Sequence, residues 1–378
     1  MATIIAIPKE RRADEARVAA TPETTKKLKG LGLDVVVEQG AGAGAHYADA
    51  DYEAAGAMIA ANGAALRNAD IVLKVRGPGP DEIAQLKRGA VLVSLLAPAT
   101  ERETISKLAD AGVDAFAMEY LPRISRAQAM DVLSSQANLA GYKAVIDAAA
   151  EFGRAMPMMM TAAGTIAPAR VLVMGVGVAG LQAIATARRL GAIVSATDVR
   201  PATKEQVESL GGTFVAVIDD EFKNAQTAAG YAKEMSKEYQ AKQAALIAET
   251  IKKQDIVITT ALIPGRKAPV LVTEDMVKTM KPGSVIVDLA AEQGGNCPLT
   301  KPNQVISVHG VTIMGHTNLP GALAVDASNL YARNLFNFVS LIVDKKTGEA
   351  KLNWDDEIIK GSGVTRDGKI VHPALQAK

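Results

Sequence analysis

The sequence is poor in the residues that form disulfides and metal sites. Its 378 residues include one cysteine, Cys297, and four histidines. One cysteine cannot form an internal disulfide, and the histidines are scattered, with none at the spacing of metal ligands. We therefore expect a chain that belongs to a reducing compartment and has no metal site.

The chain also lacks a net charge of either sign. Its 42 Lys and Arg residues nearly balance its 41 Asp and Glu residues, which leaves a formal charge of +1. This balance argues against nucleic acid or anionic lipid as a partner, since both select for a basic surface. A chain of this length that is 48% hydrophobic and 22% charged is typical of a globular protein with two domains or one large one.

No apolar stretch is unbroken enough to predict a membrane span. Residues 155–187 contain only one charged residue, Arg170, but Pro157 and Pro168 interrupt the stretch and glycines cluster in its second half. A buried strand, a tight turn and a buried helix have the same composition, and we predict that arrangement here. The N-terminus becomes charged within its first ten residues, too early for a secretory signal.

Short apolar runs alternate with helical patterns along the whole chain. Near-continuous apolar runs separated by helices are typical of parallel sheets covered on both faces. Two series of runs lie on either side of a long alanine-rich helical pattern at 127–152, which predicts an α/β fold with two Rossmann-like domains joined by long helices. The predicted strands are Ile4–Ile7, Val35–Val37, Ile71–Val75, Val91–Leu96, Ala115–Met118, Val171–Met174, Ile193–Thr197, Phe214–Val217, Ile256–Thr260, Val285–Leu289 and Val311–Met314.

The end of the chain is expected to return to the first domain. Residues 322–343 have the pattern of another long helix, and a chain that crosses to a second domain and returns through a long helix often completes the first one. We therefore predict an N-terminal α/β domain at 1–135 and a second α/β domain at 136–321. A C-terminal helix and tail at 322–378 would complete the first domain.

One segment breaks the alternation of strands and helices. Residues 219–243 are long and polar where a short connection is expected. Connections of this length are often lids or binding loops. The alternative is a solvated amphipathic helix over 232–253, which suits the second half of the segment.

A glycine-rich turn indicates a nucleotide site in the second domain. Residues 170–174 have a buried strand pattern, Gly175, Gly177 and Gly180 follow as a GxGxxG motif, and 181–190 have a helical pattern. The first glycine permits a tight turn, the second lets the backbone approach a pyrophosphate, and the third allows close packing of helix and strand. The amide groups and the positive end of the helix dipole would then face the phosphates.

An acidic residue follows the next strand pattern. Asp198 lies about 20 residues beyond the glycines, where the dinucleotide fingerprint has a carboxylate that accepts hydrogen bonds from ribose hydroxyls. This carboxylate favours NAD(H), because it repels the 2′-phosphate of NADP(H). Arg200 keeps the alternative open, since an arginine nearby can accommodate that phosphate.

The densest group of polar residues outside this fingerprint lies at 122–136, before the long helix. Arg123 and Arg126 can contact phosphate or carboxamide oxygens. Three further residues recur at every third position and could share one helical face; they are Gln128, Asp131 and Ser134. The alternative interpretation is helix capping together with a solvated face.

The sequence also contains several longer motifs spread along the chain. They are IPKER at 7–11, PRISRAQ at 122–128, MDVLSSQ at 130–136, TAAGTIAPAR at 161–170, GVGVAGLQA at 175–183, GYAKEM at 230–235, TTALIPG at 259–265 and GGNCPL at 294–299. Together they resemble the NAD(H)-binding component of proton-translocating nicotinamide nucleotide transhydrogenase. The resemblance covers essentially the whole chain.

The resemblance implies a dimeric two-domain α/β protein that lies peripherally on the cytoplasmic face of the bacterial membrane and binds NAD(H) in its second domain. It also implies two partners, a component that binds NADP(H) and a membrane component that carries protons. Hydride would pass directly between the two nicotinamides, with no covalent intermediate and no small organic substrate.

The resemblance further implies which residues form the site. The nicotinamide and its ribose would be held by Arg123, Gln128, Asp131 and Ser134, with Ile124, Ser125 and Arg126 beside them in the same loop. The adenosine diphosphate half would be bound by Gly175, Gly177, Val178, Gly180, Asp198, Val199 and Arg200. Gly230 and Tyr231 would lie on a mobile loop that closes over the nucleotide.

Alanine dehydrogenase, which shares this architecture, is the alternative enzyme. That family uses an arginine near the N-terminus, a lysine in the third strand and a histidine after the fourth strand to bind and protonate a keto acid. Arg17 and Lys74 could match the first two, but residues 90–99 contain no histidine, so reductive amination lacks its acid/base group. A non-catalytic, NAD-responsive binding module is a third alternative.

Overall fold

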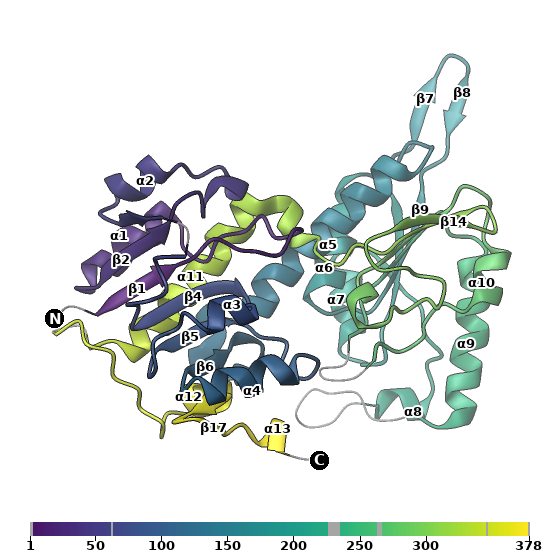
Figure 1. Ribbon diagram of the computed structural model, residues 1–378. Coiled ribbons are helices and arrows are strands. Elements are labelled where there is room, and N and C mark those ends of the chain that lie inside the picture. Colours follow the sequence, from purple (N-terminus) through teal and green to yellow (C-terminus); the bar gives the residue numbers. More distant parts are fainter. Residues whose placement is uncertain (1–2, 62, 226–234, 263–266, 345–346, 377–378) are drawn as a thin grey trace. The chain divides into compact units, whose positions relative to one another are not determined.

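The structure, a computed structural model, divides into two compact units (Figure 1). Unit 1 consists of Met1–Gln136 and Pro320–Lys378, and unit 2 of Ala137–Leu319. Each unit contains one large sheet, and the first five strands of each sheet have the spatial order 3-2-1-4-5. The structure describes residues 3–61, 63–225, 235–262, 267–344 and 347–376.

The sheet of unit 1 is parallel throughout, in the order β3-β2-β1-β4-β5-β6. The strand order reverses between β1 and β4, so the carboxyl ends of these two strands form a topological switch point. The strands are β1 (Ile4–Ile7), β2 (Asp34–Glu38), β3 (Met58–Ala60), β4 (Ile71–Arg76), β5 (Val91–Leu95) and β6 (Asp114–Ala117). The helices between them are α1 (Pro22–Gly30), α2 (Asp49–Ala54), α3 (Pro80–Ile83) and α4 (Arg102–Asp110).

Helix α1 shows how the local sequence starts these elements. Thr21 precedes it, and the Thr21 hydroxyl accepts a hydrogen bond from the Thr24 amide at 3.4 Å, while the Thr24 hydroxyl accepts one from the Thr21 amide at 2.8 Å. Pro22 occupies the first helical position, where no amide hydrogen is needed. This reciprocal cap fixes the beginning of the helix that covers β1 and β2.

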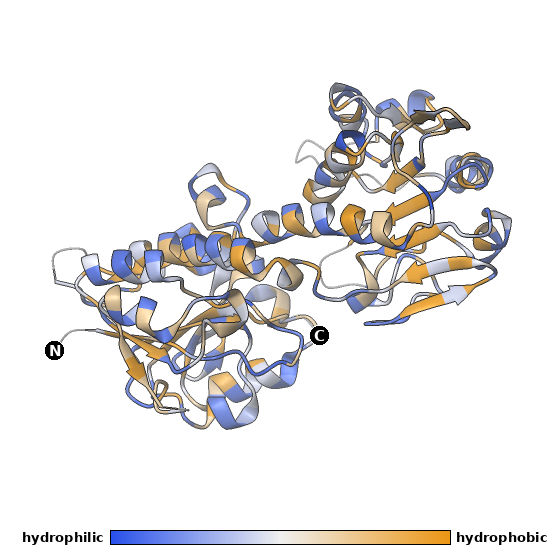
Figure 2. Ribbon diagram, turned by 90° about the horizontal axis from the view of Figure 1, so that it is seen from above, coloured by the Kyte–Doolittle hydropathy of each residue, from blue (hydrophilic) through white to orange (hydrophobic). Residues whose placement is uncertain are grey.

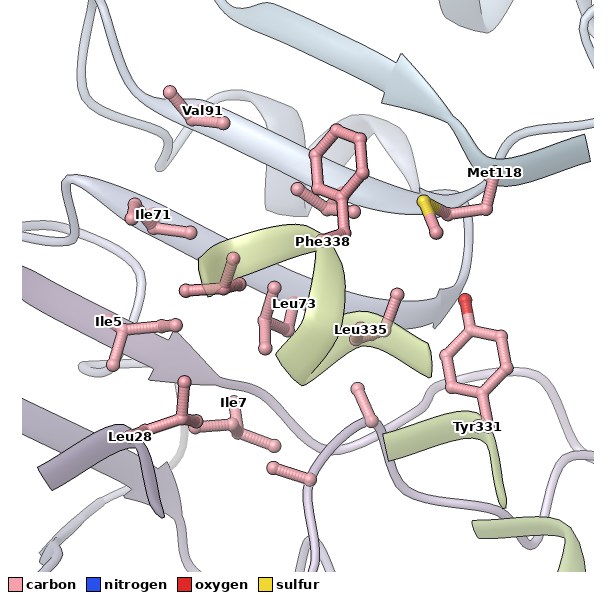
Figure 3. Packing of buried hydrophobic residues seen from close by; sticks show 14 of the residues in the cluster. Ile5, Ile7, Leu28, Ile71, Leu73, Val91, Met118, Tyr331, Leu335 and Phe338 are labelled. Carbon is pink, nitrogen blue, oxygen red and sulfur yellow. The ribbon is translucent and has the colours of Figure 1, made fainter. Parts of the chain in front are cut away.

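A helix from the C-terminal part of the chain completes the core of unit 1. Tyr331, Leu335 and Phe338 of α11 (Ala324–Ile342) lie in one buried cluster with the apolar side chains of β1 and β4 (Figure 3). Burial of each such side chain contributes about 1.5–3 kcal/mol. Unit 1 therefore depends on both ends of the chain. The later elements are α12 (Glu357–Ser362), β16 (Thr365–Arg366), β17 (Lys369–Ile370) and α13 (Pro373–Gln376).

The sheet of unit 2 has the order β11-β10-β9-β12-β13-β15-β14 and is parallel except for its last strand, β14, which is antiparallel to β15. We expected parallel strands only. Figure 2 shows the strands as mainly hydrophobic and the helices as mixed. The strands are β9 (Arg170–Met174), β10 (Ile193–Thr197), β11 (Thr213–Phe214), β12 (Ile256–Thr259), β13 (Val285–Asp288), β14 (Val305–Val308) and β15 (Val311–Met314). The helices are α6 (Val178–Arg189), α7 (Thr203–Ser209), α8 (Asp220–Lys223), α9 (Lys237–Ile251) and α10 (Glu274–Thr279).

The segment before β9 differs from the sequence-based expectation. Instead of being buried, β7 (Met159–Thr161) and β8 (Gly164–Ile166) form an antiparallel hairpin of exposed residues (Figure 1). Met160 is 80% exposed and Met158 60%. Apolar composition alone does not decide burial, because a two-stranded hairpin has no second layer to cover it. In the described part of the chain, no helix combines the length and the apolar character needed to span a membrane.

The long helix that follows the sheet of unit 1 begins later than expected. Residues Ser125–Met130 form a short 3-10 helix, η3, and the α-helix α5 covers Val132–Glu151. The break falls at Asp131, whose φ of −72° and ψ of 92° lie outside the helical region. Its carboxylate accepts a hydrogen bond from the Ser134 amide at 2.9 Å and so caps the start of α5.

Candidate nucleotide-binding site

The glycine motif forms a tight turn between β9 and α6. Gly175 has a φ of 102°, and a Cβ there would lie 2.5 Å from the Thr260 hydroxyl. A Cβ on Gly180 would lie 1.9 Å from the Gly175 carbonyl oxygen, so the helix approaches the strand as closely as only glycine permits. These are the geometries that the fingerprint requires of its first and third glycines.

The second glycine faces open space. Gly177 directly precedes α6, and a Cβ built on it would meet no atom of the described residues within 4 Å. Gly177 has no side chain to cap the helix, so the amide groups of the first turn remain available. An amide-lined opening at the start of a 12-residue helix suits a phosphate group. Val178, the first residue of α6, is exposed beside it.

Asp198, directly after β10, faces this turn and is held by Arg200. The carboxylate accepts hydrogen bonds from the Val176 amide at 2.7 Å and from the Arg200 amide at 2.9 Å. The Arg200 guanidinium donates to both oxygens, at 2.9 and 2.8 Å. These hydrogen bonds raise the pKa of Arg200, against a smaller opposing effect of burial. Val199 between them is half exposed. Arg200 thus neutralises the very carboxylate whose effect on nucleotide choice it was expected to oppose.

In the polar segment, two of the three regularly spaced residues come together. Asp131 accepts hydrogen bonds from the Ser134 amide at 2.9 Å and from its hydroxyl at 2.5 Å. Gln128 is exposed and belongs to η3, one element earlier. The three residues therefore do not share one face of one helix, because the chain leaves the helical conformation at Asp131. Capping, the alternative interpretation, describes the Asp131–Ser134 pair.

The two arginines of this segment are both exposed. Arg126 forms a bidentate ion pair with Asp356 of the C-terminal part of unit 1, at 2.6 and 3.1 Å. The hydrogen bonds from Asp356 raise the pKa of Arg126 and those from Arg126 lower the pKa of Asp356. Exposed pairs of this kind are weak, so a ligand can compete for the guanidinium. Ile124 is half-buried and Ser125 exposed at the start of η3.

The predicted site residues therefore fall into two groups. The Arg123–Ser134 group lies in unit 1, and the Gly175–Arg200 group lies in unit 2. Gly230 and Tyr231, assigned to a closing loop, lie outside the described residues. Of the polar segment that contains them, α8 and α9 are described on either side.

Sequence reasoning missed a buried polar pair in unit 2. Asp288 at the end of β13 and Asn296 in the loop that follows are both fully buried. The Asn296 amide donates to the Asp288 carboxylate at 2.8 Å. The GGNCPL motif was noted for its resemblance only, although a glycine pair before an asparagine, next to a strand ending in aspartate, was the available signal.

The residues that a keto-acid site would need are engaged in buried ion pairs. Arg17 donates to both oxygens of Glu15 at 2.6 Å. Lys74 donates to Glu82 at 2.8 Å and lies 3.5 Å from Glu10. Burial raises the pKa of Glu10; it opposes ionisation of Glu15 too, but the hydrogen bonds from Arg17 keep the pKa of Glu15 below its ordinary value. The chain's own carboxylates thus occupy both cations.

Among the described residues, no group of three or more His, Cys, Asp or Glu side chains is placed to hold a metal ion. The single cysteine, Cys297, is buried, and burial raises the pKa of its thiol. The polar groups at the glycine turn instead fit a dinucleotide.

Known proteins similar to this chain agree with this interpretation. Models of the alanine dehydrogenase/PNT N-terminal and C-terminal domains match residues 6–140 and 144–373. An NAD(P) transhydrogenase alpha subunit of Rhodospirillum rubrum is 61% identical over 377 residues, which cover 98% of each chain. The crystal structure of transhydrogenase from Sinorhizobium meliloti is 55% identical, with a TM-score of 0.89 over 97% of this chain and 100% of that one.

An alanine dehydrogenase of Halomonas elongata is 34% identical, over 98% of this chain and 95% of its own. The chain thus shares more of its sequence with the transhydrogenases named here than with this dehydrogenase. The chain belongs to the alanine dehydrogenase/PNT family and, within it, groups with the alpha subunits of NAD(P) transhydrogenase.

Proposed function

We propose that this chain is the NAD(H)-binding subunit of a proton-translocating transhydrogenase. NADH bound to unit 2 gives its hydride directly to NADP⁺ held by a partner component, and a membrane component couples this transfer to proton movement. The observation that carries the NAD(H) assignment is the open amide-lined turn at Gly177 with Asp198 beside it. The similarity to transhydrogenase alpha subunits supports the choice of reaction.

The residues of unit 2 bind the adenosine diphosphate half. Amides of the turn that contains Gly175, Gly177 and Gly180 hold the pyrophosphate, with Val178 beside them. Asp198 accepts hydrogen bonds from the ribose hydroxyls, flanked by Val199 and Arg200. Arg200 neutralises the carboxylate and donates to the Val176 carbonyl at 3.2 Å, so it points away from an added phosphate. We therefore expect NADH to bind more tightly than NADPH; equal affinities by calorimetry would contradict the role of Asp198.

The polar segment of unit 1 holds the nicotinamide and its ribose. A carboxylate offers about four lone-pair positions, and Ser134 takes two of those of Asp131, which leaves acceptors for ribose hydroxyls. Gln128 and Arg123 are exposed and supply an amide and a cation for the carboxamide, next to Ile124, Ser125 and Arg126. Gly230 and Tyr231 close over the nucleotide. The hydride is the chemistry that NAD(H) supplies; the side chains orient it.

We also propose that the subunit is a homodimer, peripheral on the cytoplasmic face of the membrane. The β7–β8 hairpin supports the dimer, because its exposed Met158 and Met160 form an apolar surface that a second chain would cover.

The experiment that tests the function mixes this chain with an NADP(H)-binding component and follows transfer from NADH to an NADP analogue. The wild type is expected to give transfer, and no NADH formation with alanine. Asp131→Asn and Gln128→Asn should reduce the rate of transfer far more than the affinity for NADH, because orientation is lost while the adenosine half still binds. An equal loss of rate and affinity would make the segment a simple binding element. Turnover with alanine would favour the dehydrogenase.

A further inference from the structure

The loop after β12 lies directly against the glycine turn. The Thr260 hydroxyl donates to the Gly175 carbonyl at 3.0 Å, and a Cβ on Gly175 would come within 3.3 Å of the Ala261 nitrogen. In unit 2 the strand order reverses between β9 and β12. The loops after these two strands therefore form the walls of the crevice in which such sheets bind their ligands.

Asn296 fixes the next residue of this loop. Its side-chain oxygen accepts from the Ala261 amide at 3.1 Å, and its side-chain nitrogen donates to the carbonyls of Ala261 at 2.9 Å and Pro269 at 2.8 Å. Its own carbonyl accepts from the amides of Leu271 and Val272. Because the side chain is fully buried, no water replaces these bonds. One acceptor and two donors in a single short planar group are the inventory of asparagine.

The loop that carries Asn296 is built around Asp288. The Asp288 carboxylate accepts from the amides of Asn296 at 2.8 Å and Cys297 at 3.1 Å and from the Thr300 hydroxyl at 2.7 Å. Gly295 has a φ of 77°, and a Cβ there would lie 2.8 Å from the same carboxylate. A glycine is therefore required immediately before Asn296, and the whole motif presents one side chain.

We propose that Asn296 is a positioning residue for NAD(H) binding. Through Ala261 and Thr260 it sets the wall of the crevice that supports Gly175, although it is itself buried behind that wall. This inference rests on the proposed function for the identity of the ligand. It gives a joint role to two motifs, TTALIPG and GGNCPL, to which the sequence alone assigned none.

The test is calorimetric titration of the full chain with NADH. Asn296→Ala leaves the buried Ala261 and Pro269 groups unpaired and should raise the Kd for NADH about tenfold. The matched control is Thr300→Ala, which also removes a hydrogen bond to Asp288 but none to the loop; its Kd should stay within about a factor of two of the wild type.

Two further variants keep the test decisive if Asn296→Ala does not fold. Asn296→Asp retains the shape and the acceptor for the Ala261 amide but removes both donors, and it should weaken NADH binding in the same way. Thr260→Val removes only the hydroxyl that donates to Gly175. Its effect should combine with that of Asn296→Ala to less than the product of the two, because both act along the same path to the turn.

A folded Asn296→Ala protein with the wild-type Kd would overturn the inference. So would an equal weakening in Thr300→Ala, since general destabilisation of the loop would then explain both. A wild-type chain that binds no NADH would overturn the proposed function and this inference with it, which separates that failure from the other two.

Discussion

The two sheets of the molecule have the same strand order but different contents at the same place. In unit 2 the carboxyl ends of β9 and β12 meet at Gly177, beside which the structure leaves open space. In unit 1 the carboxyl ends of β1 and β4 meet at buried ion pairs that include Lys74 and Glu10. The fold supplies a crevice in both cases. The side chains decide whether a ligand or the chain itself fills it.

The charges at the switch point of unit 1 balance one another. Besides the pairs of Arg17 and Lys74, the Arg76 guanidinium lies 3.2 Å from the Glu15 carboxylate. Such clusters do not add stability over a well-packed apolar core, but each partner is needed once the others are buried. Unit 1 should therefore respond to loss of one charge with a loss of stability, and unit 2 to loss of a glycine with a loss of binding.

The largest expected effect is that of Lys74→Met. It removes the cation between Glu82 and Glu10 and should lower the free energy of unfolding by about 3–5 kcal/mol, measured by urea denaturation. Lys27→Met is the control, because the exposed Lys27–Glu23 pair should contribute only about 0.3–0.5 kcal/mol. A loss below about 1 kcal/mol for Lys74→Met would show that the cluster is not a required filling of the crevice.

Gly180→Ala should have the next largest effect, now in unit 2. Its Cβ would collide with the Gly175 carbonyl oxygen, a backbone atom, so overpacking should cost about 1–3 kcal/mol of unfolding free energy. Gly30→Ala, whose Cβ would meet nothing within 4 Å in α1, is the control and should not destabilise. Equal stability of the two variants would mean that α6 does not pack as closely on β9 as described.

A smaller difference arises from the C-terminal tail, which belongs to unit 1. His372 stacks on Tyr120, and its Nδ1 accepts from the Ala374 amide at 3.2 Å, which requires an unprotonated Nδ1. Burial lowers the pKa of His372, so the unfolded chain takes up the proton more readily. This contribution to stability is present above the unfolded pKa of about 6.5 and is lost as the pH falls through the lower folded value.

Urea denaturation at pH 7.5 and 5.5 checks this for the wild type and for His372→Phe, which keeps the ring contact. The variant should lose less stability at the lower pH. Identical losses would show that His372 does not titrate with folding.

The parts of the fold that were predictable have local signals. The strand, glycine turn and helix from β9 to α6 follow from a buried apolar run and from glycines whose roles are steric. In contrast, β14 and the β7–β8 hairpin were not predicted, because edge strands and hairpins differ from buried strands only by what lies beside them. The same holds for β3, which is three residues long.

The site was predictable to the level of its segments. Spacing of three between Gln128, Asp131 and Ser134 suggested one helical face, but spacing does not distinguish a 3-10 helix followed by a capped α-helix. The pairing of Arg200 with Asp198 depends on side-chain rotamers, and the contact between Asn296 and Ala261 joins loops that are distant in the sequence. No local pattern encodes either.

The most direct test of the difference between the two crevices is NADH binding by Gly177→Ala. Because its Cβ would meet no described atom and its backbone is extended, the unfolding free energy should change by no more than about 0.5 kcal/mol. The affinity for NADH should fall at least about tenfold, since the methyl group occupies the place of the pyrophosphate. Unchanged NADH affinity in the folded variant would contradict a nucleotide site at this turn.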